Sequence, residues 1–243
     1  MFEGLYSAAS GMEAQQHQFD AISNDMANLD TPGYKSTVVG FRDLLYSNGG
    51  YGSSTVATGA GTSAQIVGRD QSQGAINQTG RPLDVAVQGD GFLEVRRFDG
   101  TIGLTRNGRL EINAKRQLTN PQGMLVQPPI TIPAGVSIDH VTIGSDGTVE
   151  AAGRRVGKLS LVTVPAPDGL VADGDSVFSA TAASGAIRAA KGATLQQGVL
   201  EGSNVDLGDE MAKMMDAQQQ YAMGSQAIQY QAQMLQIANQ IKP

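Results

Sequence analysis

Residues 5–29 are LYSAASGMEAQQHQFDAISNDMANL, a stretch in which apolar side chains return at alternating steps of three and four residues. This spacing is the a/d rhythm of a heptad, and it predicts a long amphipathic helix. Residues 211–239 repeat the rhythm near the other end of the chain. The apolar positions of the two stripes are Leu5, Ala8, Met12, Phe19, Ile22, Met26 and Leu29, followed by Met211, Met214, Tyr221, Ile228, Ala232 and Leu235.

Two such helices, over roughly residues 3–29 and 206–240, would each extend about 40–50 Å at ~1.5 Å per residue. That length exceeds the width of a small domain, so each stripe needs a partner helix to cover it. The partner is either the other terminus of the same chain, which gives an intramolecular hairpin, or another copy, which makes the stripes a self-assembly seam. The stripes alone leave both alternatives open.

Both helices carry end signals. Pro32 disfavours helical geometry at the residue before it, and Gly33 can adopt a left-handed turn, so the first helix should end between Asn28 and Pro32. Asp206 is the predicted N-cap of the second helix, because its carboxylate can accept hydrogen bonds from free backbone N–H groups in the first turn.

The middle of the chain has the signals of antiparallel strands. Short alternating or β-branched runs are separated by Asp-Gly and Asn-Gly dipeptides, which favour tight turns. The predicted strands are residues 85–87, 92–97, 101–105, 110–112, 124–126, 141–143 and 159–164.

These signals predict an α+β fold, in which two long terminal helices pair in a coiled-coil-like module around an inserted all-β domain. Glycine, serine and threonine dominate the sequence before the β domain, which predicts an extended connector there. The five predicted segments are an N-terminal helix at 1–35, a connector at 36–79, a β domain at 80–185, a returning connector at 186–202 and a C-terminal helix at 203–243.

Composition narrows the possible partners. Only 16% of residues are charged, against about 25% in typical proteins. A weakly charged exterior suits a chain that neighbouring subunits cover. The net charge of −6, without a basic stripe, argues against binding to nucleic acid. We expect no membrane span, because no apolar run reaches the ~20 residues required, and no cleaved signal peptide, because the first residues lack a basic and then apolar pattern.

No motif predicts catalysis, a cofactor or a metal site. The chain has no cysteine and only two histidines, His17 and His140, which have no ligand partner at metal-site spacing. Residues 59–64 match a loose dinucleotide-loop pattern, but no helical periodicity follows them. We therefore expect no enzyme. The alternative is a secreted β-domain enzyme or carbohydrate binder with a helical dimerisation stalk, but the lack of tryptophan and the 5% aromatic content disfavour such a pocket.

Three segments, residues 22–35, 81–108 and 195–206, resemble the bacterial flagellar basal-body rod protein family. The first contains ISNDMANLDTPGYK, the second RPLDVAVQGDGF followed by LTRNG, and the third LQQGVLEGSNVD. Within the family the chain is most similar to the distal rod protein, with the proximal rod protein a close second. Arg116 departs from the pattern, since the family commonly has glycine at that turn. The signature positions are Asn24, Asn28, Thr31, Gly33, Tyr34, Gly198, Glu201, Ser203, Asn204 and Val205.

The resemblance implies a structural, motility-related axial protein of the flagellar basal body, located outside the cytoplasm. Family members are exported unfolded through the flagellum's own secretion channel, and they polymerise into a helical tube that transmits torque from motor to hook. The implied partners are further copies of the chain, other rod and hook subunits and the export apparatus. Such a polymer forms because contacts between copies that repeat without closing a ring generate a filament.

Overall fold

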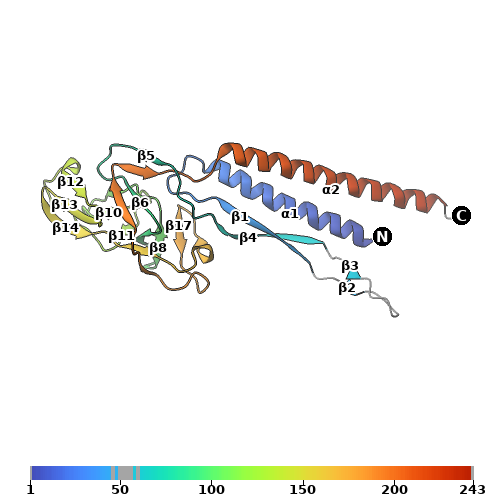
Figure 1. Cartoon of the computed structure of the whole chain (residues 1–243), viewed down its shortest axis with the longest axis horizontal. Coiled ribbons are helices and arrows are strands. Elements are labelled where there is room, and N and C mark those ends of the chain that lie inside the picture. Colours follow the sequence, from blue (N-terminus) through green and yellow to red (C-terminus); the bar gives the residue numbers. More distant parts are fainter. Residues whose placement is uncertain (1, 45–46, 49–56, 59–60, 242–243) are drawn as a thin grey trace. The chain divides into compact units, whose positions relative to one another are not determined.

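The computed structural model describes residues 2–44, 47–48, 57–58 and 61–241. The fold is α+β, with one helix near each end of the chain and a β-rich centre (Figure 1). The chain divides into two compact units. The helical unit comprises residues 1–26, 37–67 and 206–243, and the β unit comprises residues 27–36 and 68–205. This confirms the predicted class.

The helices are α1 at Phe2–Ala27 and α2 at Leu207–Ile241. The strands of the first half are β1 Thr37–Asp43, β2 Ser47–Asn48, β3 Ala57–Thr58, β4 Thr62–Arg69, β5 Ile76–Gln78, β6 Val85–Gln88, β7 Phe92–Arg96, β8 Ile102–Thr105, β9 Glu111–Ile112 and β10 Leu118–Thr119. Those of the second half are β11 Leu125–Val126, β12 Val141–Ile143, β13 Thr148–Ala151, β14 Arg154–Lys158, β15 Leu161–Thr163, β16 Val171–Ala172, β17 Val177–Ser179, β18 Arg188–Ala189, β19 Thr194–Gln197 and β20 Val199–Glu201. Short 3₁₀ turns lie at Ile138–His140 and Pro167–Gly169.

Strand β7 is the centre of a nine-stranded antiparallel sheet. Along one edge it pairs with β8, and its other pairings are with β11 near Val95 and with β15 near Phe92. The main path of the sheet runs β16-β17-β8-β7-β11-β10-β9, while β15 also pairs with β18. Strands β12, β13 and β14 form a separate three-stranded sheet.

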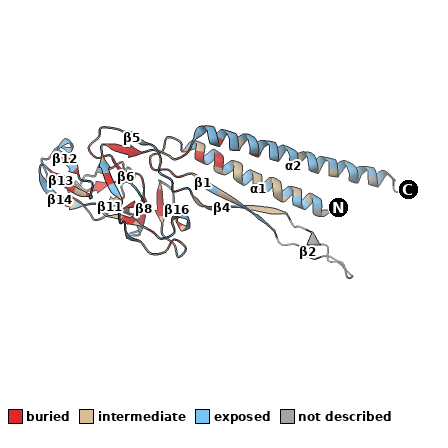
Figure 2. Ribbon diagram, in the orientation of Figure 1, coloured by how far each residue is buried: buried red, intermediate tan, exposed pale blue. Residues whose placement is uncertain are grey.

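Both faces of the central strands are covered. Leu93 and Val95 of β7 belong to the larger hydrophobic cluster, whereas Phe92 and the neighbouring Leu104 of β8 belong to the smaller one. Successive side chains of a strand point to opposite faces, so one strand contributes to both clusters. This explains why both Phe92 and Leu93, which are adjacent in β7, are buried. Figure 2 shows burial concentrated in these strands, while α2 is exposed along most of its length.

The strand predictions for 85–87, 92–97, 101–105 and 141–143 are confirmed to within a residue or two at each end. Strands β13 and β14 were not predicted; they form a hairpin around Ala152 and Gly153. Strand β14 contains Arg154 and Arg155, both exposed, so it lacks the apolar pattern from which a strand is predicted. The returning segment pairs in part with the end of the first connector, β20 with β5.

The helix ends form close to the predicted positions. Helix α1 ends at Ala27, one residue before the predicted range of Asn28 to Pro32, and Gly33 has a left-handed φ of 69°. Asp206 caps α2, since its Oδ1 accepts hydrogen bonds from the backbone N–H groups of Gly208, at 2.8 Å, and Asp209, at 3.1 Å.

The two units do not coincide with the five predicted segments. Residues 27–36 lie in the β unit, and residues 37–67, predicted as connector, lie in the helical unit. Strands β1 and β4 pair there as a two-stranded ribbon. The carboxylate of Asp25 in α1 holds the start of the ribbon, because it accepts hydrogen bonds from the backbone N–H of Thr37 at 2.8 Å and from its hydroxyl at 2.9 Å.

Arg116 adopts the left-handed backbone expected of the family's glycine, with φ of 61°. Its guanidinium donates hydrogen bonds to the carbonyl oxygens of Ile132 at 3.0 Å and Val136 at 2.8 Å. These bonds offset a backbone cost of about 1 kcal/mol for a side chain in this conformation.

We predict that Arg116→Ala lowers the free energy of unfolding of the β unit by about 1–3 kcal/mol, because it loses both hydrogen bonds and keeps the strain. Arg116→Gly should cost about 1 kcal/mol less, because glycine relieves the strain. Urea unfolding of the full chain, followed by the methyl NMR signals of the β-unit core, measures both. Equal midpoints for the two variants would contradict this account of Arg116.

Candidate functional site: the signature cluster and the helical seam

The signature residues from the two ends of the chain meet inside the β unit. The backbone N–H of Gly33 donates to the carbonyl oxygen of Glu201 at 2.9 Å. The backbone N–H of Asn204 donates to the carbonyl oxygen of Tyr34 at 3.4 Å. The segments around residues 33–35 and 201–204 therefore lie side by side, although more than 160 positions separate them in sequence, as between Lys35 and Glu201.

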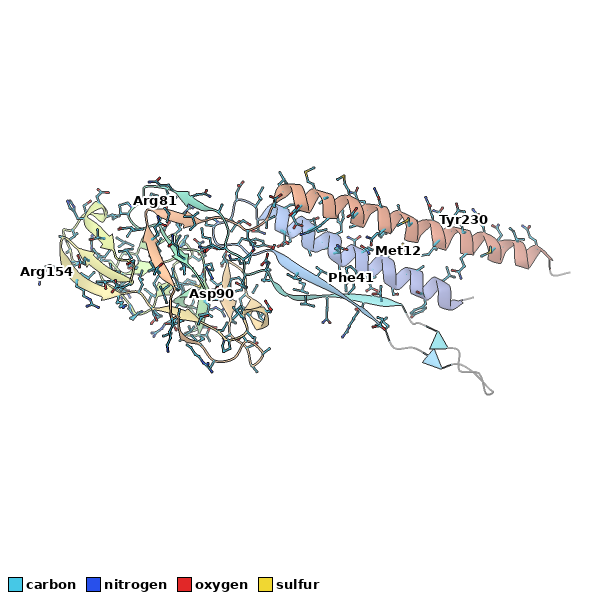
Figure 3. The ribbon with its side chains drawn as sticks, viewed as in Figure 1. Met12, Phe41, Arg81, Asp90, Arg154 and Tyr230 are labelled. Atoms are coloured by element: carbon cyan, nitrogen blue, oxygen red, sulfur yellow. The ribbon has the colours of Figure 1, made fainter. Side chains whose placement is uncertain are left out.

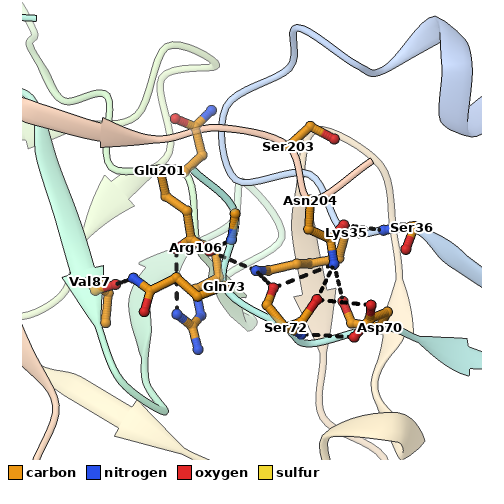
Figure 4. A network of polar contacts seen from close by, with 12 residues as sticks. Lys35, Ser36, Asp70, Ser72, Gln73, Val87, Arg106, Glu201, Ser203 and Asn204 are labelled. Atoms are coloured by element: carbon orange, nitrogen blue, oxygen red, sulfur yellow. Dashed lines mark hydrogen bonds and ion pairs between the residues drawn. The ribbon is translucent and has the colours of Figure 1, made fainter. Parts of the chain in front are cut away.

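A buried ion cluster lies at this junction (Figure 4). The side chains of Lys35, Glu201 and Arg106 are almost completely buried. The Nζ of Lys35 is 2.6 Å from Oε1 of Glu201, and Nη1 of Arg106 is 3.4 Å from Oε2. Oε1 also accepts a hydrogen bond from the backbone N–H of Gly74 at 3.1 Å. One carboxylate therefore contacts two cations and accepts from a backbone donor.

The protonation of Lys35 depends on that carboxylate. Burial lowers the pKa of Lys35 below its ordinary value of 10.5, while the hydrogen bond and negative charge of Glu201 oppose the shift. Keeping the ammonium charged inside the folded chain thus costs free energy, and Glu201 offsets part of that cost. Lys35 also donates to the carbonyl oxygen of Ser72 at 2.5 Å.

Asn204 ties three backbone segments together. Its Oδ1 accepts a hydrogen bond from the backbone N–H of Ser36 at 2.8 Å, and its Nδ2 donates to the carbonyl oxygen of Asp70 at 2.9 Å and to Oγ of Ser72 at 3.1 Å. An asparagine amide can donate and accept at the same time, which an aspartate cannot do. This explains why an amide suits position 204.

Gly33 is required by space as well as by its backbone conformation. A Cβ at this position would lie 2.5 Å from the backbone nitrogen of Asn107 and 2.6 Å from the carbonyl carbon of Arg106. The turn that follows α1 therefore packs directly on the loop that carries Arg106. Above the neighbouring Tyr34 ring, the guanidinium carbon of Arg69 lies 5.2 Å from the ring centroid, within cation–π range.

The other signature residues have varied surroundings. Oγ1 of Thr31 donates to Oδ1 of Asn28 at 3.1 Å, and Gly198 has a left-handed φ of 77°. Oγ of Ser203 accepts from the backbone N–H of Val205, which is itself buried. Asn24 is exposed on α1, in the helical unit.

Within the helical unit, α1 and α2 run antiparallel side by side (Figure 1). Gly4 lies close to the side chain of Gln231, and Nε2 of Gln15 donates to Oε1 of Gln220 at 2.6 Å. The predicted α1 stripe is half-buried or buried at each of its seven positions, and Ile22 is the most buried of them. Six of these positions lie on α1, on its side withdrawn from solvent, and Leu29 follows the end of the helix.

The residues of α2 that contact α1 form what we call the contact line. At two turns of the helix this line passes through Ala217 and Gly224, where the predicted stripe has the next residues, Gln218 and Ser225. Gly224 meets α1, since a Cβ there would lie 2.9 Å from Cγ of Met12, and Ala217 is buried. The predicted stripe instead has a serine at 225 and the exposed Gln218. Small residues allow close approach of the helices, and apolarity alone does not reveal them. In Figure 3, Met12 lies between the two helices.

The remaining predicted α2 positions divide between two environments. Met214 and Ile228 are half-buried, whereas Met211, Tyr221 and Ala232 are exposed. The side-chain surroundings of Leu235 lie outside the described residues.

Three family models match the chain. They are "Flagella basal body rod protein" over residues 5–35, "Flagellar hook protein FlgE/F/G D1 domain" over residues 86–151 and "Flagellar basal body rod FlgEFG protein C-terminal" over residues 196–241. Together they cover both terminal helices and the first half of the β unit.

Full-length relatives decide the family. The flagellar basal-body rod protein FlgG of Borreliella burgdorferi is 36% identical over 264 residues, which cover 100% of this chain and 99% of the relative. FlgG of Caulobacter vibrioides is 37% identical, with 99% of each chain covered. FlgF of Salmonella typhimurium is 31% identical, with 94% of this chain and 93% of the relative covered. The chain belongs to the flagellar basal-body rod protein family.

As a member of the basal-body rod family, this chain is a structural subunit of the rod. The competing interpretation, a secreted enzyme or carbohydrate binder with a dimerisation stalk, finds no support among these relatives. Among the helices that the structure describes, none is both long and apolar enough to cross a membrane. Across the same described residues, no group of three or more acidic or histidine side chains is placed to hold a metal ion.

Four residues of the site in this rod subunit were not among the predicted site residues: Lys35, Asp70, Ser72 and Arg106. Lys35 and Arg106 stood inside the quoted motifs, so a charged residue within a family motif was the available signal. Ser72 gave no signal, because it contributes its backbone carbonyl to Lys35.

Proposed function

We propose that this rod subunit polymerises through its terminal helices into a helical tube that transmits torque from motor to hook. A second apolar stripe on α2 carries the proposal. We call it the outer stripe: Met223, Ala227, Tyr230, Met234 and Ile237. Its residues recur at steps of four and three, so they share one helix face. The four large members are between 56 and 64% exposed.

The outer stripe and the contact line lie on different faces of α2. Gly224 and Gln231 face α1, whereas Tyr230 lies on the side of α2 away from α1 (Figure 3). A contiguous exposed apolar patch on a water-soluble chain marks an interaction surface. Fully burying a side chain such as methionine or isoleucine stabilises by about 1.5–3 kcal/mol. Four such side chains therefore provide a strong driving force for packing against a neighbouring subunit.

In the assembled tube, we propose that α1 and α2 pack in a coiled-coil-like manner through the predicted self-assembly seam. The terminal segments 1–35 and 203–243 then assemble, and the segments 36–79 and 186–202 connect them to the β domain at 80–185. The outer stripe of one copy would pack against a different surface of the next copy, and a contact between different surfaces can repeat without closing and build an open polymer.

The rest of the proposal follows the family. The subunit acts without catalysis, is exported by the flagellar secretion channel without a cleaved signal peptide and resides in the basal body outside the cytoplasm. Its partners are further copies, other rod and hook subunits and the export apparatus. We assign it to the distal rod subtype, a choice supported by the full-length similarity to proteins named FlgG.

Amide hydrogen exchange of the full chain, before and after assembly, tests this function. We expect residues 223–237 to exchange at least about tenfold more slowly once assembled, because neighbouring subunits would suppress the local opening of α2. Amides of the β-unit core, such as Leu93 and Val95, should exchange equally slowly in both states. Full protection of α1 and α2 in the free chain would contradict the proposal, because the helices would then be complete without neighbours.

A further inference from the structure

A notch of about 240 Å³ opens between α1 and α2 in the helical unit. Its lining residues are Gln15, Gln16, Phe19, Ala217, Gln218 and Tyr221. The notch lies where glutamine interrupts the α1 stripe, so the two helices do not fill the space between them there. Its walls combine aromatic and aliphatic surface with glutamine side chains.

An unsatisfied acceptor lies at the notch. The Oε1 atom of Gln15 is buried and has no hydrogen-bond partner among the described residues, while its Nε2 is used by Gln220. A buried polar atom without a partner is costly, so a donor that enters the notch would gain both a hydrogen bond and relief of that cost. The aromatic and aliphatic walls favour a donor with an apolar body. Tyrosine has both properties.

We propose that the notch receives Tyr230 from a second copy of the chain. Tyr230 is 64% exposed and lies within the outer stripe, so the flanking Met223, Met234 and Ile237 would pack beside the notch. The chain's own Tyr230 cannot fill it, because it lies on α2 itself, on the side away from α1. Tyr6 of α1 is also exposed, but its helix neighbours toward the C-terminal end, Ala9 and Ser10, are small, so no apolar stripe continues from it as one does around Tyr230.

This inference rests on the proposed function, and it names the contact through which one copy binds the next. Tyr230 and the notch lie on different surfaces of the same chain. Each copy therefore offers one Tyr230 and one notch, and the contact can repeat indefinitely.

A double-mutant cycle on the full chain tests the contact. The measured quantity is the critical concentration for assembly, obtained by sedimentation of wild type, Tyr230→Phe, Gln15→Leu and the double variant. We expect Tyr230→Phe to raise it about fivefold, as for the loss of one hydrogen bond. In the Gln15→Leu background the same change should have almost no effect, since the acceptor is gone. Tyr6→Phe, the matched control, should leave the value unchanged.

The outcomes separate the inference from the function on which it rests. A wild-type chain that does not assemble at any concentration overturns the proposed function. A chain that assembles, but in which Tyr230→Phe has the same effect in both backgrounds, overturns the Tyr230–Gln15 contact alone. A shift caused by Tyr6→Phe instead of Tyr230→Phe overturns the choice of tyrosine. Because Tyr230 is exposed in the free chain, its replacement should leave folding intact.

Discussion

Glu201→Gln is expected to lower the free energy of unfolding of the β unit by about 3–5 kcal/mol, the size typical when one partner of a buried ion pair is removed. Glu201 is the counterion for both Lys35 and Arg106, at 2.6 and 3.4 Å. The amide of glutamine has almost the same shape but carries no charge. Two buried cations would then share no carboxylate, and the cost of desolvating them would no longer be offset.

Asp84→Asn is the matched control, because Asp84 is an equally buried carboxylate in the same unit. Neither of its oxygens has a hydrogen-bond donor among the described residues, and the nearest cation, Nε of Arg81, is 3.9 Å away. Removing its charge should change the free energy of unfolding by less than about 1 kcal/mol, or should stabilise the fold. Urea unfolding followed by core methyl NMR signals compares the variants. Equal losses for Glu201→Gln and Asp84→Asn would show that the ion cluster does not hold the two signature segments together.

Helix ends, turns and single strands could be predicted from the sequence, because neighbouring residues determine them. The end of α1 before Pro32, the left-handed turn at Gly33 and the Asp206 cap each depend on a few adjacent residues. The β7 and β8 strands were predictable for the same reason, since apolar runs with intervening turn dipeptides specify them. Arg116 shows a limit of this approach, because the bonds that compensate its backbone come from Ile132 and Val136, far along the chain.

Long-range pairing could not be predicted in the same way. Lys35 and Glu201 are 166 positions apart, and nothing near either residue identifies its partner. The contact line on α2 was displaced because apolarity was used to find it, whereas Ala217 and Gly224 make contact through their small size. The ion pair and the contact line both depend on side chains from a distant segment of the chain, which the neighbouring sequence does not identify.

Ile22→Asp is expected to raise the critical concentration for assembly by at least about a hundredfold. Ile22 is 4% exposed on α1 and lies within the predicted seam. A carboxylate at that position would be buried without a counterion, which costs several kcal/mol and separates the two helices instead. The β unit should remain folded, since Ile22 lies in the helical unit. Ser23→Asp adds the same charge at the next, exposed position and should alter assembly less than about threefold.

Electron microscopy of the purified full chain at rising concentration tests the central claim most directly. The account predicts open-ended tubes for wild type and for Ser23→Asp, and only unassembled particles for Ile22→Asp. Discrete wild-type dimers that do not elongate, or tubes that Ile22→Asp forms as readily as wild type, would contradict assembly through the terminal helices.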